Sequence, residues 1–403
     1  MKQLSFNGSG SEYFKIWIVN ILLVSITLGL YYPWAKVRNL RYFYGNSTLE
    51  DRNFDYHATG KQLFVGYLIA MALFIVYVII EQLVPLGGPV LISVLFLAIP
   101  WIIWRSLMFT MRMTSFSNVR FGFEGKLGQA YINFFLLPLL FFISLYALPI
   151  AAAIILPKYQ SSLGDVFSAS LGGLIFLAII VSMVASVYFF ALMQKRNTSY
   201  LINGYRYGQG KFSTDLNVWP FAKIVLKTIG LSIVVFFGVM MFVGAAVVIV
   251  GVGAGLADVA QLGQMTSPEE IVGQLLVGGG LVAVIAAYLF MLFAAFFVAA
   301  YMQTRQRIYV LENTLLDDKI AFVSTLRARS FAWVMISNLL LVMFTLGLGT
   351  PWAKVRVARL MLENTHVDAP EGFDEYITQQ QQAQSSLGEQ IGDAFDVDVG
   401  IGI

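Results

Sequence analysis

The sequence predicts a mainly α-helical, polytopic membrane protein that carries repeated short β-hairpins on one side of the membrane. Of its 403 residues, 58% are hydrophobic and only 12% are charged, whereas soluble domains carry roughly 25% charged residues. A membrane-spanning helix needs about 20 apolar residues. Six stretches meet this requirement: residues 63 to 84, 88 to 109, 131 to 156, 166 to 193, 224 to 254 and 274 to 303.

Positive charge alternates between the segments that flank these helices. Four of them, residues 33 to 62, 110 to 130, 194 to 223 and 304 to 329, are rich in Lys and Arg, whereas the three intervening links carry one lysine in total. Basic links face the cytoplasm by the positive-inside rule. We therefore expect a multi-pass protein of a bacterial inner membrane with both termini in the cytoplasm.

Two shorter apolar runs, residues 14 to 32 and 330 to 348, complicate this topology. As single spans they would place the two identical PWAKVR segments, at 33 to 38 and 351 to 356, on opposite sides of the membrane. The conflict disappears if each run enters the membrane and returns to the same side. Gly and Pro interrupt helices, and they supply the expected helix breaks: Gly29, Pro33, Gly347, Gly349 and Pro351. Six transmembrane helices plus two re-entrant helical hairpins is the preferred fold, and eight transmembrane helices is the alternative.

A self-match indicates an internal repeat, because TLGLYYPWAKVRNLR at 27 to 41 recurs as TLGLGTPWAKVRVAR at 345 to 359. A weaker signature of a Thr, a polar turn and alternating aromatic or apolar residues follows each cytoplasmic helix end. Alternation predicts strands, and Asn203-Gly204 predicts a two-residue hairpin turn. Since unpaired strand edges are a liability, we expect five β-hairpins that pair with each other or pack against helix ends. Five separate interfacial loops are the alternative.

The repeated signature also divides the chain into a membrane domain, residues 1 to 376, and a Gln-rich, acidic, flexible tail, residues 377 to 403. The domain is expected to contain five units, each a helical hairpin followed by a β-hairpin, at about 11–62, 63–126, 131–212, 219–323 and 330–376.

The blocks TLGLYYPWAKVRNLRYFYGNST and TLGLGTPWAKVR, with the aromatic hairpins, resemble the YjgN-like family of bacterial inner-membrane proteins, whose function is uncharacterised. The hydropathy pattern extends this resemblance over residues 1 to about 376. The resemblance implies placement in the inner membrane. It supplies no substrate, cofactor or catalytic residue.

Cations repeated in the two matching blocks are candidate binding residues. On a helix, the spacing of Arg38 and Arg41, and of Arg356 and Arg359, places each pair on one face. Near the membrane boundary such cations suit lipid phosphates or an anion path. Anchoring at the membrane boundary by snorkelling side chains is the alternative and the simpler explanation.

Two amides, Asn20 and Asn338, lie midway along the short apolar helices, where an unpaired amide is costly. An interhelical hydrogen bond or a solute would satisfy them. The full set of candidate contacts to a small solute or to anionic lipid headgroups is Asn20, Lys36, Arg38, Arg41, Asn338, Lys354, Arg356 and Arg359.

Several kinds of chemistry find no support. The chain has no cysteine, and its two histidines, His57 and His366, lie apart without a carboxylate cluster, so no metal site or catalytic triad is expected. No phosphate-binding loop is present. We therefore expect no cofactor, no metal and no nucleic-acid partner; a membrane-embedded enzyme ranks third.

Two functions stay open. A transporter or channel for a small solute is favoured by the repeated units and the broken helices, which resemble the discontinuous helices of transporters. The alternative is a non-catalytic scaffold or lipid-interacting protein that recruits a cytoplasmic partner. The sequence identifies neither a substrate nor an oligomeric state.

Overall fold

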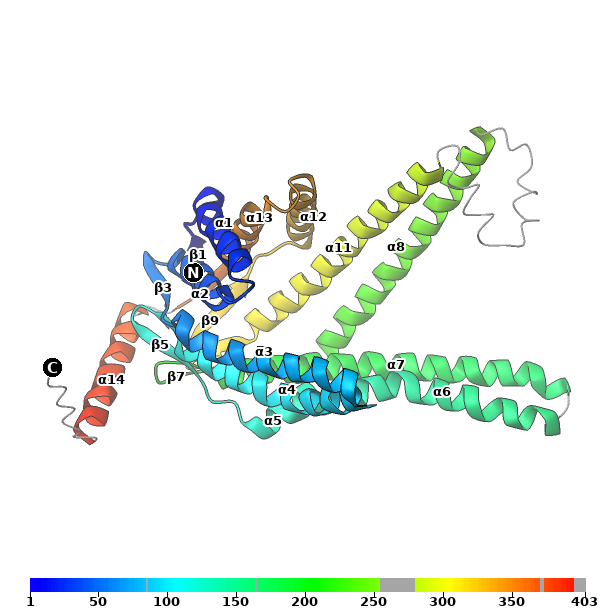
Figure 1. The fold of residues 1–403 in the computed structure, drawn as a ribbon, viewed down its shortest axis with the longest axis horizontal. Coiled ribbons are helices and arrows are strands. Elements are labelled where there is room, and N and C mark those ends of the chain that lie inside the picture. Colours follow the sequence, from blue (N-terminus) through cyan, green and yellow to red (C-terminus); the bar gives the residue numbers. More distant parts are fainter. Residues whose placement is uncertain (85, 164, 254–279, 370–372, 395–403) are drawn as a thin grey trace. The chain divides into compact units, whose positions relative to one another are not determined.

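The structure, a computed structural model, describes residues 1–84, 86–163, 165–253, 280–369 and 373–394. Figure 1 shows its long helices and short strands. The chain divides into two compact units, one made of residues 1–222, 307–326 and 341–403 and the other of residues 223–306 and 327–340.

The six predicted long helices are confirmed. Within the described residues, six helical segments are long and apolar enough to cross a membrane, and at most 22% of the most apolar window of each is buried. In the first unit, α3 and α4 run antiparallel, as do α6 and α7 (Figure 1). These helices are α3 (Gly60–Leu83), α4 (Gly87–Arg112), α5 (Leu127–Tyr131) with the π-helical turn η1 (Ile132–Leu136) and α6 (Leu137–Leu163), α7 (Asp165–Gly204), α8 (Val218–Gly253) and α11 (Gly280–Glu312). In the second unit, Phe242 of α8 stacks on Phe290 of α11 with ring centroids 5.7 Å apart.

Two pairs of shorter helices flank this set: α1 (Gly10–Ile26) with α2 (Tyr32–Gly45), and α12 (Ala328–Phe344) with α13 (Thr350–Glu363). The members of each pair are separated by a turn that contains the predicted glycine breaks. Gly29 and Gly347 have φ of +93° and +92°, in the left-handed region that favours glycine. Pro33 and Pro351 lie in the first turns of α2 and α13, where a missing N–H costs no helical hydrogen bond.

Ten short strands form one closed barrel, all within the first unit. Each strand pairs antiparallel with its neighbours in chain order, and β1 pairs with both β2 and β10 to close the ring. The expectation that the hairpins pair with one another is confirmed. The strands are β1 (Lys2–Phe6), β2 (Ser47–Leu49), β3 (Arg52–Tyr56), β4 (Thr114–Phe116), β5 (Val119–Phe123), β6 (Tyr205–Tyr207), β7 (Gly210–Thr214), β8 (Thr314–Leu316), β9 (Ile320–Ser324) and β10 (Thr365–Asp368).

Two details of the predicted hairpins are wrong. The segment after α13 forms a single strand, β10, which pairs with the N-terminal strand β1. Four strand pairs are therefore hairpins of consecutive strands, and the fifth pair joins the first strand to the last. Asn203 and Gly204 end α7 instead of forming a turn. The Asn203 side chain accepts a hydrogen bond from the Thr214 backbone N–H at 2.8 Å, which ties the helix end to β7. The turn of this hairpin is Gly208-Gln209.

An Asn side chain caps three of the helices that precede a hairpin or β10. The side-chain amides of Asn46, Asn313 and Asn364 donate to the carbonyl oxygens four residues earlier, at 2.8, 2.7 and 2.8 Å. These bonds satisfy carbonyl groups that a helix end leaves without partners. At these three positions the Asn residue marks the point where a helix ends and a strand follows.

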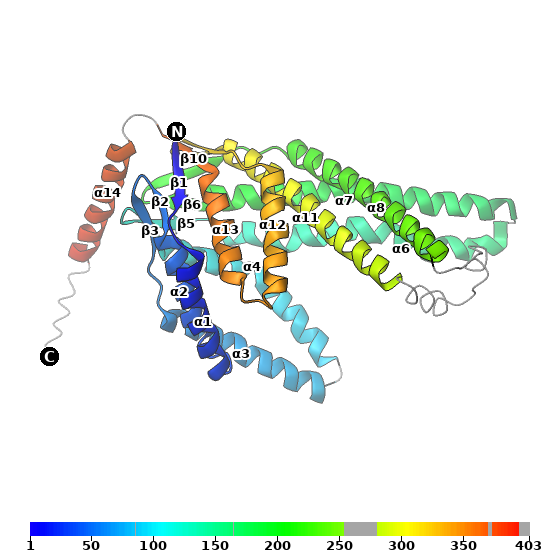
Figure 2. The same ribbon diagram turned by 90° about the horizontal axis from the view of Figure 1, so that it is seen from above.

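The barrel lumen is apolar, and every strand contributes to it. Its lining consists of Leu4, Leu49, Phe54, Phe116, Phe121, Tyr207, Phe212, Leu316, Ile320, Phe322 and Val367, together with Phe373 and Tyr376. The last two belong to α14 (Phe373–Ala394), beside the barrel in Figure 2. The described part of the expected flexible tail, residues 377 to 394, is thus helical; its Gln, Ala, Leu and Glu residues favour helix. The five-unit division remains a prediction.

Helix α14 lies across the end of the barrel formed by the hairpin turns. The Gln380 side chain accepts a hydrogen bond from the Gln209 N–H at 2.9 Å, and Gln384 accepts one from the Arg120 N–H at 3.1 Å. The Tyr376 hydroxyl donates to the Asp317 carboxylate at 2.6 Å. Burial, and then this hydrogen bond, raise the pKa of Tyr376 above its usual value, so the hydroxyl remains a donor. Ile377 is 1% exposed, and this helix closes one end of the lumen.

Candidate functional site

The structure brings three of the predicted residues to one cavity, between α1, α2 and α13. Asn20, Lys36 and Lys354 line this cavity of about 380 Å³, which we call the Lys36/Lys354 hollow. The other lining residues are Trp17, Ile21, Val24, Ser25, Tyr32, Ala35, Asn39 and Leu40. Two lysines far apart in sequence thus face the same space, and no acidic side chain among the described residues lines it.

Asn20 is held by its own helical hairpin. The side chain is 4% exposed and donates to the Asn39 side-chain oxygen at 3.1 Å and to the Ala35 carbonyl at 3.5 Å. The Arg38 guanidinium donates to the Asn20 oxygen at 3.4 Å and to the Tyr31 hydroxyl at 3.3 Å. These bonds satisfy the buried amide, so the interhelical role is fulfilled between α1 and α2.

Two other predicted arginines bind backbone. Arg41 donates to the Ala58 carbonyl at 2.8 Å, and Arg359 donates to the Gly8 carbonyl at 2.9 Å. Ala58 lies just before α3, which packs against α2, and Gly8 lies just before α1, which packs against α13. Arg356 and Asn338 also have partners within the chain.

Lys36 and Lys354 differ from these arginines. Both side chains are exposed, and within the part of the chain that the structure describes neither has an ion pair or side-chain hydrogen bond. They are the cations of the predicted set that are available to a ligand.

A second cavity shares Lys36. It measures about 610 Å³, lies between α2, α3 and α4, and includes Arg105 and Arg112 but no acidic residue. Lys36 belongs to a different helical hairpin from Arg105 and Arg112, so the sequence alone did not indicate that the three cations line one cavity.

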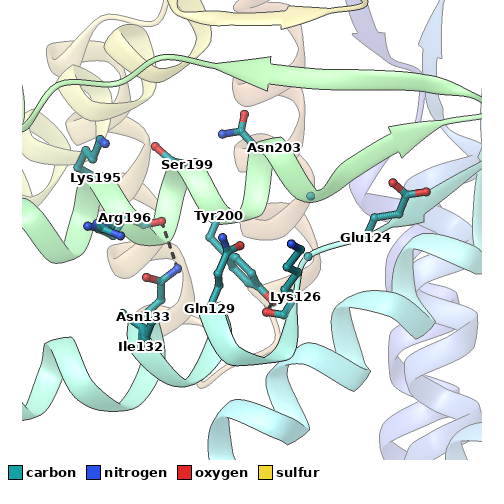
Figure 3. Close-up of a pocket in the computed structure, with 12 residues that line it drawn as sticks. Glu124, Lys126, Gln129, Ile132, Asn133, Lys195, Arg196, Ser199, Tyr200 and Asn203 are labelled. Carbon is teal, nitrogen blue, oxygen red and sulfur yellow. Dashed lines mark hydrogen bonds between the residues drawn. The ribbon is translucent and has the colours of Figure 1, made fainter.

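A third basic cavity lies between α5, η1 and α7 (Figure 3). It measures about 330 Å³, and we call it the Arg196 hollow. Lys126, Lys195 and Arg196 line it, and the single acid in its lining, Glu124, forms an ion pair with Arg206 at 2.8 Å. The charge left in the hollow is therefore positive.

The walls of the Arg196 hollow are fixed by polar contacts between helices. In Figure 3 the Asn133 amide of η1 points at the Arg196 carbonyl of α7, a hydrogen bond of 3.4 Å. The Tyr200 hydroxyl donates to the Lys126 carbonyl at 3.3 Å. The buried Ser199 hydroxyl has no hydrogen-bond partner among the described residues. Sequence reasoning missed this site, although the π-helical turn beside it is a feature frequent at functional sites.

The described residues hold no group of three or more His, Asp or Glu side chains that could bind a metal ion. The hollows instead offer unpaired cations and amide or hydroxyl donors. This donor set suits phosphate oxygens.

Six long apolar helices, with a closed strand barrel joining their connecting segments, define a multi-pass membrane protein. The chain belongs to the family described as "Bacterial protein of unknown function (DUF898)", whose model matches residues 1–394. This finding agrees with the resemblance noted in the sequence.

The curated relatives are named inner-membrane proteins. The chain is 29% identical over 377 residues to "Inner membrane protein YjgN" of Salmonella typhimurium, covering 90% of this chain and 88% of the relative. The protein of that name from Escherichia coli O157:H7 is 25% identical over 367 residues, covering 90% and 87%. In strain K12 it is 35% identical over 159 residues, covering 39% and 40%. No solved structure matches.

Proposed function

We propose that this protein interacts with lipids of the bacterial inner membrane and binds the phosphate of an anionic headgroup in the Lys36/Lys354 hollow. One observation carries the proposal: the two equivalent lysines of the matching blocks line a single cavity without an acid. An anion bound in this cavity would be attracted by both ammonium groups. Basic pockets between membrane helices on the cytoplasmic side are sites for lipid headgroups.

The tips of the short hairpins support insertion into the membrane. Leu28, next to Gly29, is 92% exposed, and Leu346, next to Gly347, is 94% exposed. Exposed leucines at two matching tips are explained if both tips lie among acyl chains. Helix α2 begins at Tyr32, so Lys36 lies about one helical turn, or roughly 6 Å at 1.5 Å per residue, along α2 from the tip. This is near the headgroup level if the tip inserts only into the headgroup and acyl boundary.

The barrel supports the re-entrant topology over eight transmembrane helices. If α1 and α12 each crossed the membrane alone, β1 and β2 would lie on opposite sides, as would β9 and β10. Yet β1 pairs with β2 and β9 with β10. This pairing favours short helical hairpins that start and end on the barrel side. The positive charge of the connecting segments favours the cytoplasm for that side and for both termini.

The test is lipid binding by full-length protein in detergent, measured by native mass spectrometry with phosphatidylglycerol and with zwitterionic phosphatidylcholine. The double variant Lys36→Gln/Lys354→Gln removes two cations, each contributing about 1 kcal/mol near a membrane surface. We expect phosphatidylglycerol affinity to fall roughly 30-fold, with little change for phosphatidylcholine.

The matched control is Lys15→Gln/Lys61→Gln, which makes the same change in net charge at two exposed lysines outside the hollow. Equal losses in both double variants would show a general charge effect and contradict the proposal. Competition by inorganic phosphate without a preference for phosphatidylglycerol would identify a free anion as the ligand.

A transporter or channel is the second candidate. It is favoured by the polar cluster of Asn20, Arg38 and Asn39 in a helical hairpin that is interrupted at Gly29, since discontinuous helices form the solute sites of transporters. It requires a water path to Asn20 from the side opposite the barrel. The low burial of the long helices argues against it, because a solute path needs helices packed around it.

A further inference from the structure

The barrel lumen contains a cavity of about 230 Å³ whose lining exposes no polar surface. The hydroxyls of its two tyrosines point to protein partners: Tyr207 donates to the Phe116 carbonyl at 3.2 Å, and Tyr376 to Asp317 at 2.6 Å. A buried water needs two to four polar partners. The lumen therefore offers nothing that would hold water.

The size of this cavity indicates that it binds a ligand. Protein interiors contain few voids larger than a water molecule. A cavity of about 150 Å³ lined by Leu, Ile and Phe stays dry and takes up benzene, and the lumen is larger. Its lining of aromatic and aliphatic side chains from all ten strands matches an apolar molecule.

We propose that the lumen binds one acyl chain, of a fatty acid or of a membrane lipid, and that α14 covers its outer end. The strands, of three to five residues, make a short barrel that suits a thin, flexible apolar chain. The barrel connects directly to membrane helices at the ends of its hairpins opposite the turns, where acyl chains are the abundant apolar molecules.

Helix α14 fits the role of a cover because it has two kinds of contact. Phe373 and Ile377 pack into the apolar cluster of the barrel, whereas Gln380 and Gln384 bond to backbone N–H groups of the hairpins. The Gln381 amide donates to the Ser117 carbonyl at 2.6 Å. The polar bonds seal the edge of the barrel mouth, and the apolar side chains complete the lumen.

The test is photo-crosslinking of the full-length protein in lipid nanodiscs. One arm uses a fatty acid with a diazirine near its methyl end, and the other uses a phospholipid with the same group on one chain. Adducts are located by peptide mass spectrometry. We expect adducts on the lumen-lining strand residues in at least one arm, and the arm that gives them identifies the source of the chain.

The double variant Val367→Phe/Leu316→Phe fills the lumen, and we expect it to lower barrel adducts about tenfold while leaving adducts on the long helices unchanged. The matched control, Asn53→Phe, adds an aromatic ring on an exposed position of β3 and should behave as wild type. Gel filtration checks folding, and the single variant Val367→Phe replaces the double variant if the latter aggregates.

The absence of barrel adducts in wild-type protein in both arms would overturn the proposal, as would equal labelling of a folded filled variant. This inference does not depend on the basic hollows: Lys36→Gln/Lys354→Gln should lose headgroup affinity while keeping the lumen adducts. Failure of one proposal is thus distinguishable from failure of the other.

Discussion

At the residue scale, the two PWAKVR blocks make matching contacts. A Cβ atom placed on Gly60 would lie 2.3 Å from the Trp34 ring, and one on Gly10 would lie 2.2 Å from the Trp352 ring. Each tryptophan thus covers the first residue of a neighbouring helix, so closely that only glycine fits. The tryptophan of each block fixes the position of α2 on α3 or of α13 on α1.

This contact predicts a specific loss of stability in Gly60→Ala. The new methyl group has to displace a bulky indole, and overpacking of this kind typically costs 1–3 kcal/mol. Thermal unfolding of the purified protein in detergent measures the effect. The control is Gly66→Ala on the same helix, where a Cβ would meet no atom within 4 Å and where alanine favours helix by about 0.5–1 kcal/mol. Equal midpoints for the two variants would refute the packing argument.

At the element scale, the long helices and most strand pairs were predictable from sequence patterns, whereas β1 and α14 were not. The long helices were predictable because an apolar run of 20 residues has one stable environment. The strand pairs were predictable from alternation, but β1 was not, because its partners β2 and β10 are distant in sequence. Helix α14 was not predicted because a Gln-rich composition indicates disorder, whereas its docking depends on the burial of Phe373 and Ile377 and on side-chain hydrogen bonds to the hairpins.

The same reasoning applies to the candidate site. Lys36, Lys354 and Asn20 were identifiable because they recur in matching blocks. That both lysines share a cavity followed only from the closed ring, which brings α13 next to α1. The Arg196 hollow has no sequence repeat, and its cations looked like ordinary positive-inside residues.

The docking of α14 gives a second prediction. Ile377→Asp places a carboxylate at a side chain that is 1% exposed. The lost burial of an isoleucine is worth about 1.5–3 kcal/mol, and an unpaired buried charge adds to it. We expect α14 to detach and limited proteolysis to cleave it at least tenfold faster. Thr378→Asp, on the exposed neighbouring position, introduces the same charge and should keep wild-type rates; equal cleavage of both variants would contradict docking through Ile377.

At the scale of the whole molecule, barrel closure constrains the topology more strongly than charge does. The barrel contains β1, β10 and the strands that follow α2, α4, α7 and α11. If the whole barrel lies on one side of a membrane, as we propose, each helical hairpin leaves from that side and returns to it. The positive-inside rule is then needed only to assign that side to the cytoplasm. The same argument applies to the short and to the long helical hairpins.

A cysteine scan tests this topology directly, because the chain has no native cysteine. In vesicles of known orientation, a membrane-impermeant thiol reagent should label five barrel positions from the same, cytoplasmic side and Val84→Cys, in the α3–α4 link, from the other. The barrel variants, all at exposed positions, are Gln3→Cys, Asn53→Cys, Arg120→Cys, Lys211→Cys and Lys319→Cys. Labelling of Gln3→Cys and Asn53→Cys from opposite sides would contradict the re-entrant hairpins and support the alternative topology of eight transmembrane helices.

The short hairpins decide between the two functions in the same assay. Ile26 and Phe344 are 77% and 85% exposed, so cysteines there are expected to stay unlabelled from both sides because lipid, not protein, covers them. Asn20→Cys should react from the barrel side or not at all if the hollow binds a lipid headgroup. Its labelling from the opposite side would require a hydrated path through the membrane, and the transporter would then replace the lipid-interacting protein as the preferred function.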